Sequence, residues 1–222
     1  MSKATYSKCT ASNGVVLHYL KASPNDVQLR ANRGSVCGQS ATAINGGFFD
    51  FASGSILSIA VQNDKPIKGN KGDYGSGWRN AKYPRGTLAW DATARRYLMQ
   101  IVQSADELNV TDRNRYWAQG GISMSLQDDR GWEKIARQQN MPNIYGKAFR
   151  TAIVYGTGLN LWLIVTNTRC SAAEFRAAVK QKIGSGTLAD GIFLDGSGSS
   201  QLRCAEALLK GDGRTVCSII TV

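Results

Sequence analysis

The sequence predicts a mixed α/β domain built on largely antiparallel sheets, with several hairpins and at least one strand–helix–strand crossover over residues 159–195. Three observations support this class. Apolar and polar residues alternate in much of the first hundred residues, two apolar runs flank a Thr-Gly dipeptide, and a capped amphipathic segment separates two apolar strands. The chain has 222 residues, 42% of them hydrophobic, so we expect one domain spanning 1–222.

The first half of the chain is predicted to consist mainly of strands and turns. Alternation predicts strands at 14–23 and 25–32, and a short apolar approach precedes a Gly-Gly bend within 42–50. Residues 56–69 predict a hairpin with Asn63 and Asp64 at its turn, and 86–103 predict another strand pair. The segment 104–149 is the least regular, with a strand at 120–126 and a short helix at 132–140.

The crossover is the clearest block. Two apolar strands, 150–156 and 159–166, precede a helix that begins with a capping box of Ser171 and Glu174. The chain then returns as the strand Ile-Phe-Leu-Asp, which we expect to run parallel to 159–166 with right-handed chirality. Because ligands of open α/β sheets collect at the carboxyl ends of strands, Asp195 lies where a site is expected.

Net charge and cysteine content narrow the partners and the compartment. Lys and Arg outnumber Asp and Glu by 27 to 16, a formal charge of +11, which favours anionic partners or simply a basic, soluble surface. No apolar run is long enough to span a membrane and no secretory leader is recognisable, so we expect a cytoplasmic protein. The five cysteines form no C-x-x-C pair, and reduced thiols are favoured over a Cys204–Cys217 disulfide.

The loop after Asp195, Gly196-Ser197-Gly198-Ser199-Ser200, has backbone amides and hydroxyls but little side-chain bulk. It matches neither a P-loop, nor G-x-G-x-x-G, nor a G-x-S-x-G elbow. A single histidine, His18, excludes multi-histidine metal sites and makes a Ser-His-Asp triad improbable. Acid chemistry beside an anion pocket remains, with a tight turn that only requires small residues as the alternative.

Four ordered motifs resemble those of the phosphodiester glycosidase family. They are AINGGFFD (43–50), GGISMSL (120–126), RTAIVYG (150–156) and LDGSGSSQL (194–202). Two positions depart from the family pattern: Ser197 replaces the usual middle glycine, and Ile122 replaces the proline after Gly-Gly. The resemblance covers nearly the whole chain from about residue 14, and it implies hydrolysis of a glycosidic bond to a phosphodiester-linked group.

Carrying the motifs over residue by residue gives a candidate site. The resemblance implies Asp195, Arg150 and Asn45 as catalytic residues, and a substrate-binding set of Gly46, Gly47, Phe49, Gly120, Gly121, Thr151, Gly196, Ser197, Gly198, Ser199 and Ser200. An arginine presents a fork of donors that matches a phosphate, although a surface salt bridge is the structural alternative. Most glycosidases use two carboxylates, and Asp50 and Asp91 are candidates for the second. The metal ligands are undetermined, and a divalent cation such as Ca²⁺ or Mg²⁺ stays open as a cofactor.

Residues 65–96 combine eight basic residues with four aromatic ones, Tyr74, Trp78, Tyr83 and Trp90. This composition fits nucleic-acid binding or a basic flap over a glycan-phosphate site, but a solvated loop with aromatic side chains turned into the core is favoured. Overall we expect a hydrolase with an anionic small-molecule or glycan-phosphate substrate. The alternative is a non-catalytic binding protein for a nucleotide, nucleic acid or phosphorylated glycan.

Overall fold

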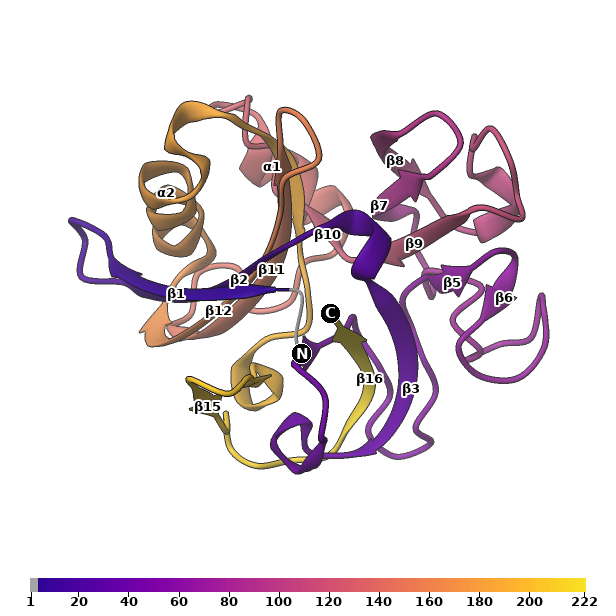
Figure 1. Cartoon of the computed structure of the whole chain (residues 1–222), viewed down its shortest axis with the longest axis horizontal. Helices are drawn as coiled ribbons and strands as arrows, with labels where there is room; N and C mark the ends of the chain where they lie inside the picture. The colour runs from indigo at the N-terminus through magenta and orange to yellow at the C-terminus, as the bar shows by residue number, and fades with distance from the viewer. Residues whose placement is uncertain (1–3) are drawn as a thin grey trace.

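The computed structural model describes residues 4–222 and consists of three antiparallel sheets with two short helices (Figure 1). The first sheet has six strands in the order β1-β2-β12-β11-β13-β10. Their bounds are β1 Thr5–Thr10, β2 Val16–Ala22, β10 Ile122–Ser123, β11 Ala148–Gly156, β12 Leu161–Cys170 and β13 Leu188–Phe193. The two helices, α1 Trp132–Gln138 and α2 Ala172–Lys182, share a hydrophobic core with this sheet.

The other two sheets have five strands each. The second sheet has the order β15-β14-β4-β16-β3 and the third has β6-β5-β9-β7-β8. The second sheet comprises β3 Gln28–Gly34, β4 Ala43–Asn45, β14 Leu202–Arg203, β15 Leu208–Leu209 and β16 Val216–Thr221. The third sheet comprises β5 Ala60–Gln62, β6 Lys65–Pro66, β7 Arg85–Asp91, β8 Arg96–Val102 and β9 Tyr116–Gly120.

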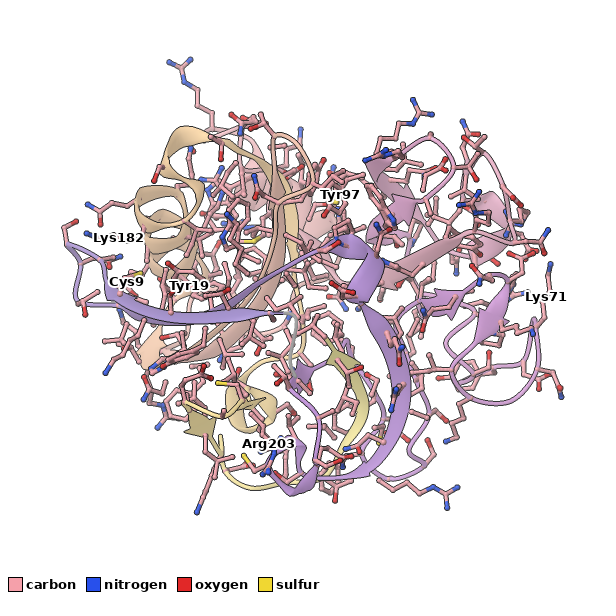
Figure 2. All side chains as sticks on the ribbon, viewed as in Figure 1. Cys9, Tyr19, Lys71, Tyr97, Lys182 and Arg203 are labelled. Atoms are coloured by element: carbon pink, nitrogen blue, oxygen red, sulfur yellow. The ribbon has the colours of Figure 1, made fainter. Side chains whose placement is uncertain are left out.

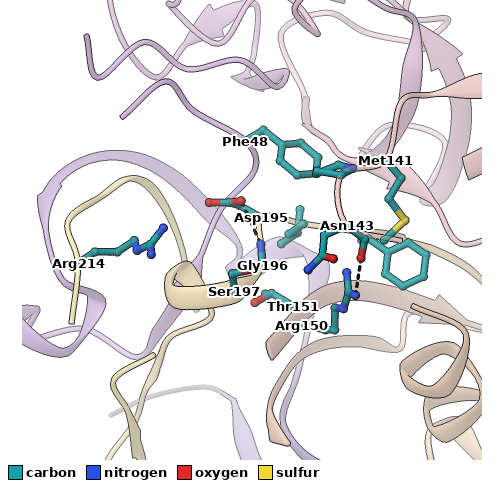
Figure 3. A pocket seen from close by; sticks show the side chains of 12 residues that line it. Phe48, Met141, Asn143, Arg150, Thr151, Asp195, Gly196, Ser197 and Arg214 are labelled. Atoms are coloured by element: carbon teal, nitrogen blue, oxygen red, sulfur yellow. Dashed lines mark hydrogen bonds between the residues drawn. The ribbon is translucent and has the colours of Figure 1, made fainter. Parts of the chain in front are cut away.

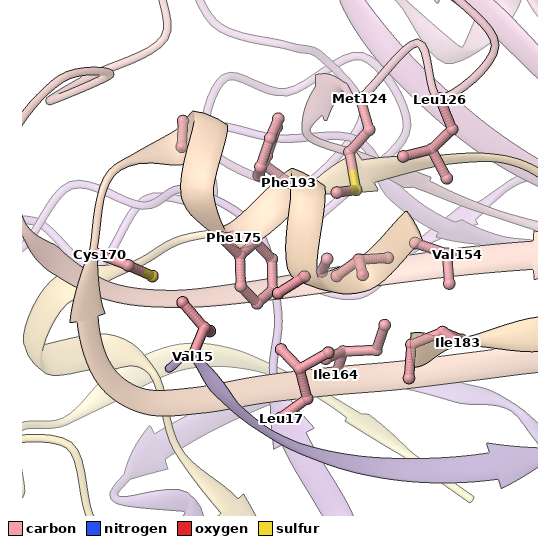
Figure 4. Close-up of a cluster of buried hydrophobic side chains, with 14 of the residues drawn as sticks. Val15, Leu17, Met124, Leu126, Val154, Ile164, Cys170, Phe175, Ile183 and Phe193 are labelled. Atoms are coloured by element: carbon pink, nitrogen blue, oxygen red, sulfur yellow. The ribbon is translucent and has the colours of Figure 1, made fainter. Parts of the chain in front are cut away.

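The first sheet is buried on both faces. Along β12, Trp162 and Ile164 contribute to the core under the helices, whereas Leu161, Leu163 and Val165 contribute to the core shared with the second and third sheets. Figure 4 shows the helix-side core, where Phe175 and Phe193 lie together with ring centroids 6.2 Å apart. Because side chains alternate between faces, burial of both faces explains why β11 and β12 read as continuous apolar runs.

The structure corrects the predicted class in one respect. Strands hold 41% of the residues and helices 15%, so the fold is mostly β rather than mixed α/β. The crossover is present as β12–α2–β13, but β11 lies between the two strands and pairs antiparallel with both. Two antiparallel neighbours of one strand run in the same direction, so the predicted parallel orientation is confirmed, with β11 inserted between the two strands.

Several local predictions are confirmed. Ser171 and Glu174 form the capping box of α2, and Asn63 and Asp64 both have positive φ at the β5–β6 turn. All five cysteines are free, so the Cys204–Cys217 disulfide is absent. Alternation in 5–10 was not recognised, although β1 pairs with β2 along its whole length. Within residues 4–222, no helix has both the length and the apolar character needed to cross a bilayer.

The basic and aromatic segment 65–96 divides between core and surface. Trp78 and Trp90 are buried, as the favoured interpretation required, but Tyr74 and Tyr83 are exposed. Lys71 lies at the outer edge of the molecule beside the third sheet (Figure 2), with its Nζ 4.7 Å from the centroid of the Trp78 ring. The segment contributes β6, β7 and the first residue of β8 to the third sheet, and residues 67–84 connect β6 to β7 through loops and turns.

Candidate active site

Asp195 lies at the junction of the first and second sheets, immediately after β13. The Leu194 N–H donates to the Thr151 carbonyl of β11 at 2.8 Å, which extends the pairing of the first sheet by one residue. The Asp195 carbonyl accepts from Asn45 Nδ2 at 2.8 Å, and Asn45 ends β4 of the second sheet. The backbone of Asp195 is therefore fixed from both sheets.

Four residues behind Asp195 form a hydrogen-bonded seam, through the side chains of Asn45, Thr151 and Ser200 and the backbone N–H of Gln201. The Thr151 hydroxyl donates to Asn45 Oδ1 at 2.9 Å and lies 3.0 Å from Ser200 Oγ. The Gln201 N–H donates to the same Asn45 oxygen at 3.1 Å, and all four residues are at most 2% exposed. The seam joins the first, third and fourth motifs in one buried network.

Asn45 has no hydrogen-bonding group left for a substrate. An asparagine amide has two donors and about two acceptor positions. Its Nδ2 donates to the carbonyls of Asp195 and Gly46, and its Oδ1 accepts from Thr151 and Gln201. The geometry thus gives Asn45 a positioning role behind Asp195 rather than the catalytic contact expected from the motif.

The motif glycines allow close packing between sheets. A Cβ at Gly46 would overlap the Ser218 side chain, and one at Gly121 would overlap the Phe193 carbonyl. Gly47 and Gly120 are equally confined, by Ser58 and by Asn80 respectively. None of these four glycines lines the pocket at Asp195, so they do not form the substrate-binding surface that the motifs suggested.

A pocket of about 210 Å³ opens in front of Asp195 (Figure 3). Its walls combine apolar side chains with two arginines, and Asp195 is the one carboxylate among them within the described residues. The lining residues are Phe48, Met141, Pro142, Asn143, Arg150, Thr151, Phe193, Leu194, Asp195, Gly196, Ser197 and Arg214. Five of the fourteen predicted site residues therefore line it: Arg150, Thr151, Asp195, Gly196 and Ser197.

Burial alters the acidity of Asp195. Desolvation raises the pKa of this carboxyl to about 6, while hydrogen bonds from Ser199 and from the Gly196 N–H (3.0 Å), together with the charge of Arg214, act in the opposite direction. A carboxyl with a pKa near neutrality exchanges a proton readily under physiological conditions. Perturbed carboxyls in pockets are typical of catalytic sites.

Arg214 is a pocket residue that sequence reasoning missed. Its Nε lies 2.9 Å from both Asp212 carboxylate oxygens, and Asp212 in turn donates its N–H to the Gly198 carbonyl at 3.1 Å. A Cβ at Gly198 would overlap the Asp212 carboxylate and lie 2.6 Å from Arg214 Nε. Gly198 is therefore needed so that this ion pair can lie against the loop after Asp195.

Arg150, the arginine that the motifs pointed to, is largely committed to the backbone. Its side chain donates to the carbonyls of Asn143 (2.8 Å), Gly146 (2.7 Å) and Cys170 (3.2 Å), and the residue is only 5% exposed. Figure 3 shows it at the floor of the pocket below Asn143. Arg150 thus forms neither the surface salt bridge weighed as the structural alternative nor a free phosphate-binding fork; it holds the 143–146 loop that forms one wall.

The remaining candidates lie outside the pocket. Phe49 packs with the cluster of Val36, Ala43, Val216 and Ile219, and its neighbour Phe48 lines the pocket instead. Asp91 is fully buried and accepts from the N–H groups of Ala94 and Thr111, so it has a structural role in the third sheet. Asp50 accepts from the N–H and hydroxyl of Ser53 in a neighbouring loop.

The other predictions for the loop have mixed outcomes. Ser199 and Ser200 are buried, and Ser197 is exposed with a φ of +56°, in the left-handed region that favours glycine. Within residues 4–222, no three His, Cys, Asp or Glu side chains are grouped closely enough to hold a metal ion. The divalent cation stays a prediction that these residues do not support with a ligand cluster.

Comparisons with known proteins place this geometry in context. No protein-family model matches the sequence, and no curated protein matches it significantly. The catalytic domain of zebrafish N-acetylglucosamine-1-phosphodiester alpha-N-acetylglucosaminidase, auto-inhibited by its pro-peptide, is similar over 100% of this chain and 82% of its own, with a TM-score of 0.63 and 16% identity.

Two bacterial structures share the same architecture. A hypothetical protein from Synechocystis matches 98% of this chain and 61% of its own, with a TM-score of 0.56 and 14% identity. A putative exported protein from Burkholderia pseudomallei matches 93% and 73%, with a TM-score of 0.57 and 13% identity. The chain therefore has the fold of the phosphodiester glycosidase catalytic domain that its four motifs resemble.

Proposed function

We propose that this protein is a hydrolase that cleaves the glycosidic bond between a sugar and a phosphodiester-linked group. The observation that carries the proposal is Asp195, a carboxyl with a raised pKa at the base of a pocket that also contains an arginine with an accessible guanidinium. The shared fold and the four motifs support the same assignment.

Asp195 acts at the sugar. In its carboxylate form it stabilises positive charge at the anomeric carbon, either directly as a nucleophile or as the base that removes a proton from the attacking water. The bond from the anomeric carbon to the phosphate oxygen breaks, the oxygen of water is added to that carbon, and the phosphate leaves as an anion. Both roles require deprotonated Asp195, so activity rises with pH through about 6.

Arg214 acts at the phosphate. Its guanidinium is held by Asp212 on one side, and its side chain retains 38% exposure in the pocket near Asp195. A guanidinium stabilises the charge that develops on a departing phosphate. Because such a leaving group departs as a stabilised anion, a second carboxylate acting as general acid is not required by this chemistry.

The decisive experiment separates turnover from binding. A panel of sugar-1-phosphodiesters and nucleotide sugars is incubated with the wild type, Asp195→Asn and the surface control Asp73→Asn, with divalent metal or with chelator. We expect hydrolysis by the wild type and the control, and a loss of about 10³-fold in Asp195→Asn with binding retained. Normal hydrolysis by Asp195→Asn would overturn the assignment.

The same panel tests the non-catalytic alternative. Binding without turnover by the wild type, under every metal condition, would indicate an anion-binding protein instead. For nucleic acid, the affinity is measured against salt concentration, because several phosphate contacts give a steep linear fall of log K with log salt. We expect no such salt-dependent complex.

A further inference from the structure

A second hollow lies beside the catalytic pocket and has no role in the chemistry described so far. Its volume is about 570 Å³, compared with about 210 Å³ for the pocket at Asp195. The lining residues are Ala31, Asn32, Arg33, Phe51, Ala52, Ser53, Gly54, Lys68, Thr215 and Cys217. They come from β3, the loop after β4, the loop after β6 and the start of β16.

One short segment separates the two cavities. Arg214 faces the catalytic pocket, whereas Thr215 and Cys217 face the second hollow and Val216 between them is buried. Burial is the main cause that raises the pKa of the Cys217 thiol; the charge of Lys68 acts in the opposite direction, and the negative charges of Asp195 and Asp50 add to the rise. Residues next to each other in the chain thus line the two cavities, which places the hollow beside the position of a phosphate held by Arg214.

The lining of the hollow favours an anion. Lys68 and Arg33 are exposed, and within the described residues neither forms a salt bridge with a carboxylate, while Lys68 Nζ donates to the Gly54 carbonyl at 2.7 Å. The Asn32 and Ser53 side chains already bond to protein groups, and no carboxylate lines the cavity. Two cations are thus the groups available to recognise a ligand, and the ring of Phe51, 67% exposed, adds an apolar face.

We infer that this hollow is the subsite for the group on the far side of the phosphate, and that it selects groups carrying a second negative charge, such as a phosphate or a carboxylate. The inference rests on the proposed function, because that function supplies the phosphodiester whose two ends the cavities would hold. Guanidinium and ammonium groups without acidic partners are the side chains that such an anion requires.

The first test compares two substrates that differ only in this charge. The sugar-1-phosphodiesters carry either a glycerol or a phosphoglycerol group, and the variants are Arg33→Ala, Lys68→Ala and the double substitution. We expect the double variant to raise KM for the phosphoglycerol substrate about 10-fold and to leave KM for the glycerol substrate unchanged. Equal effects on both substrates, or none on either, would overturn the inference.

Matched controls remove a charge of the same kind outside the hollow. The control variants are Arg30→Ala and Lys65→Ala. Arg30 lies on the same strand as Arg33, and Lys65 lies on β6 just before Lys68. Neither residue lines the cavity, so both variants should treat the two substrates as the wild type does. Selective loss of the charged substrate in these controls would assign the effect to general surface charge and contradict the subsite.

A second test is independent of hydrolysis. Cys217 lines the hollow, so its alkylation by iodoacetamide near pH 9, followed by peptide mapping, reports occupancy of that cavity. Glycerol 3-phosphate should slow alkylation of Cys217 several-fold in the wild type, but not in the double variant, and glycerol should have no effect. Cys9, which lies far from the hollow on β1, provides the internal reference (Figure 2).

The two tests distinguish failure of the subsite from failure of the proposed function. Protection of Cys217 by glycerol 3-phosphate without hydrolysis of any substrate would retain an anion site and overturn the proposed reaction. Hydrolysis without charge selectivity and without protection would retain the reaction and overturn the subsite.

Discussion

The seam behind Asp195 and the wall in front of it are built in different ways. The seam of Asn45, Thr151, Ser200 and Gln201 is buried, fully hydrogen-bonded and drawn from three of the four sequence motifs. The wall is made by side chains such as Phe48, Met141 and Arg214, of which Met141 and Arg214 lie outside the four motifs.

 The motifs therefore supply the whole seam but only part of the wall, whose other side chains come from segments outside the motifs.

The two arginines illustrate the same contrast. Arg150 belongs to a motif, and its guanidinium holds three backbone carbonyls below the pocket. Arg214 belongs to none, and its guanidinium is paired with Asp212 while its side chain stays partly exposed beside Asp195. We therefore expect the motif arginine to affect stability and the other arginine to affect activity.

The largest effect should follow removal of the seam. Asn45→Ala leaves the Asp195 carbonyl, the Gln201 N–H and the Thr151 hydroxyl without their buried partner, so the free energy of unfolding should fall by about 3 kcal/mol. Urea titration followed by circular dichroism measures this. As a control, Asn160→Ala removes one exposed hydrogen bond and should change stability little. A fully stable Asn45→Ala protein without activity would instead place Asn45 in contact with substrate.

The next effect should be on catalysis alone. Arg214→Ala removes the cation nearest the proposed phosphate position, and we expect kcat/KM to fall about 100-fold, while the free energy of unfolding changes by no more than about 0.5 kcal/mol. Arg150→Ala should show the opposite pattern, with a clear loss of stability because three carbonyls lose a buried donor. The assignment fails if Arg150→Ala is stable and inactive while Arg214→Ala is active.

These contrasts also explain how far the sequence could predict the site. The place of Asp195 after an apolar strand and before a loop of small residues was predicted correctly, because strand and loop are both local patterns. Arg214 could not be identified this way, since its proximity to Asp195 depends on the short β14–β15 hairpin, which brings Asp212 back to Gly198. The hairpin is only two residue pairs long, and its sequence carries little alternation.

The fold shows a similar limit. The strands at 86–103 and the helix after Ser171 were predicted from turn and capping signals that lie within a few residues of each other. The position of β11 between β12 and β13 depends on the pairing of residues such as Ile153 and Ile192, almost forty positions apart. Period and capping patterns contain no information on which of several buried strands become neighbours, so the insertion of β11 between β12 and β13 was not predicted.

A smaller effect concerns the pH dependence of stability. The pKa of Asp195 is raised from 3.8 to about 6 in the folded protein, so between these values the folded state binds a proton that the unfolded chain has released. The contribution of Asp195 to stability therefore falls as the pH rises through this window. The difference between the two pKa values corresponds to a loss of about 3 kcal/mol in the free energy of unfolding, and partial exposure of the carboxyl reduces this loss to about 2 kcal/mol.

Asp195→Asn makes this contribution measurable. The variant should be more stable than the wild type by about 2 kcal/mol above pH 7, and the two should converge near pH 4. Chemical denaturation at a series of pH values gives the difference in stability directly. Other titrating groups, such as Glu174 with its pKa lowered to about 2, contribute equally to both proteins, so their contributions cancel in the difference. A difference that grows toward low pH would contradict a raised pKa for Asp195.

The smallest effect is expected at Ser197, where the sequence departs from the usual glycine. A residue with a Cβ loses about 1 kcal/mol of stability at the φ of +56° that Ser197 adopts. Glycine removes this strain, but it also raises the conformational entropy of the unfolded chain, which offsets part of the gain. Ser197→Gly should therefore stabilise the protein by about 0.5 kcal/mol. Ser185 has a φ of +45° in a turn outside both cavities, so Ser185→Gly is the matched control for backbone strain. If the Ser197 hydroxyl contacts substrate, KM should rise in Ser197→Gly and stay constant in Ser185→Gly, whereas equal kinetics in both variants would limit Ser197 to the backbone of the pocket.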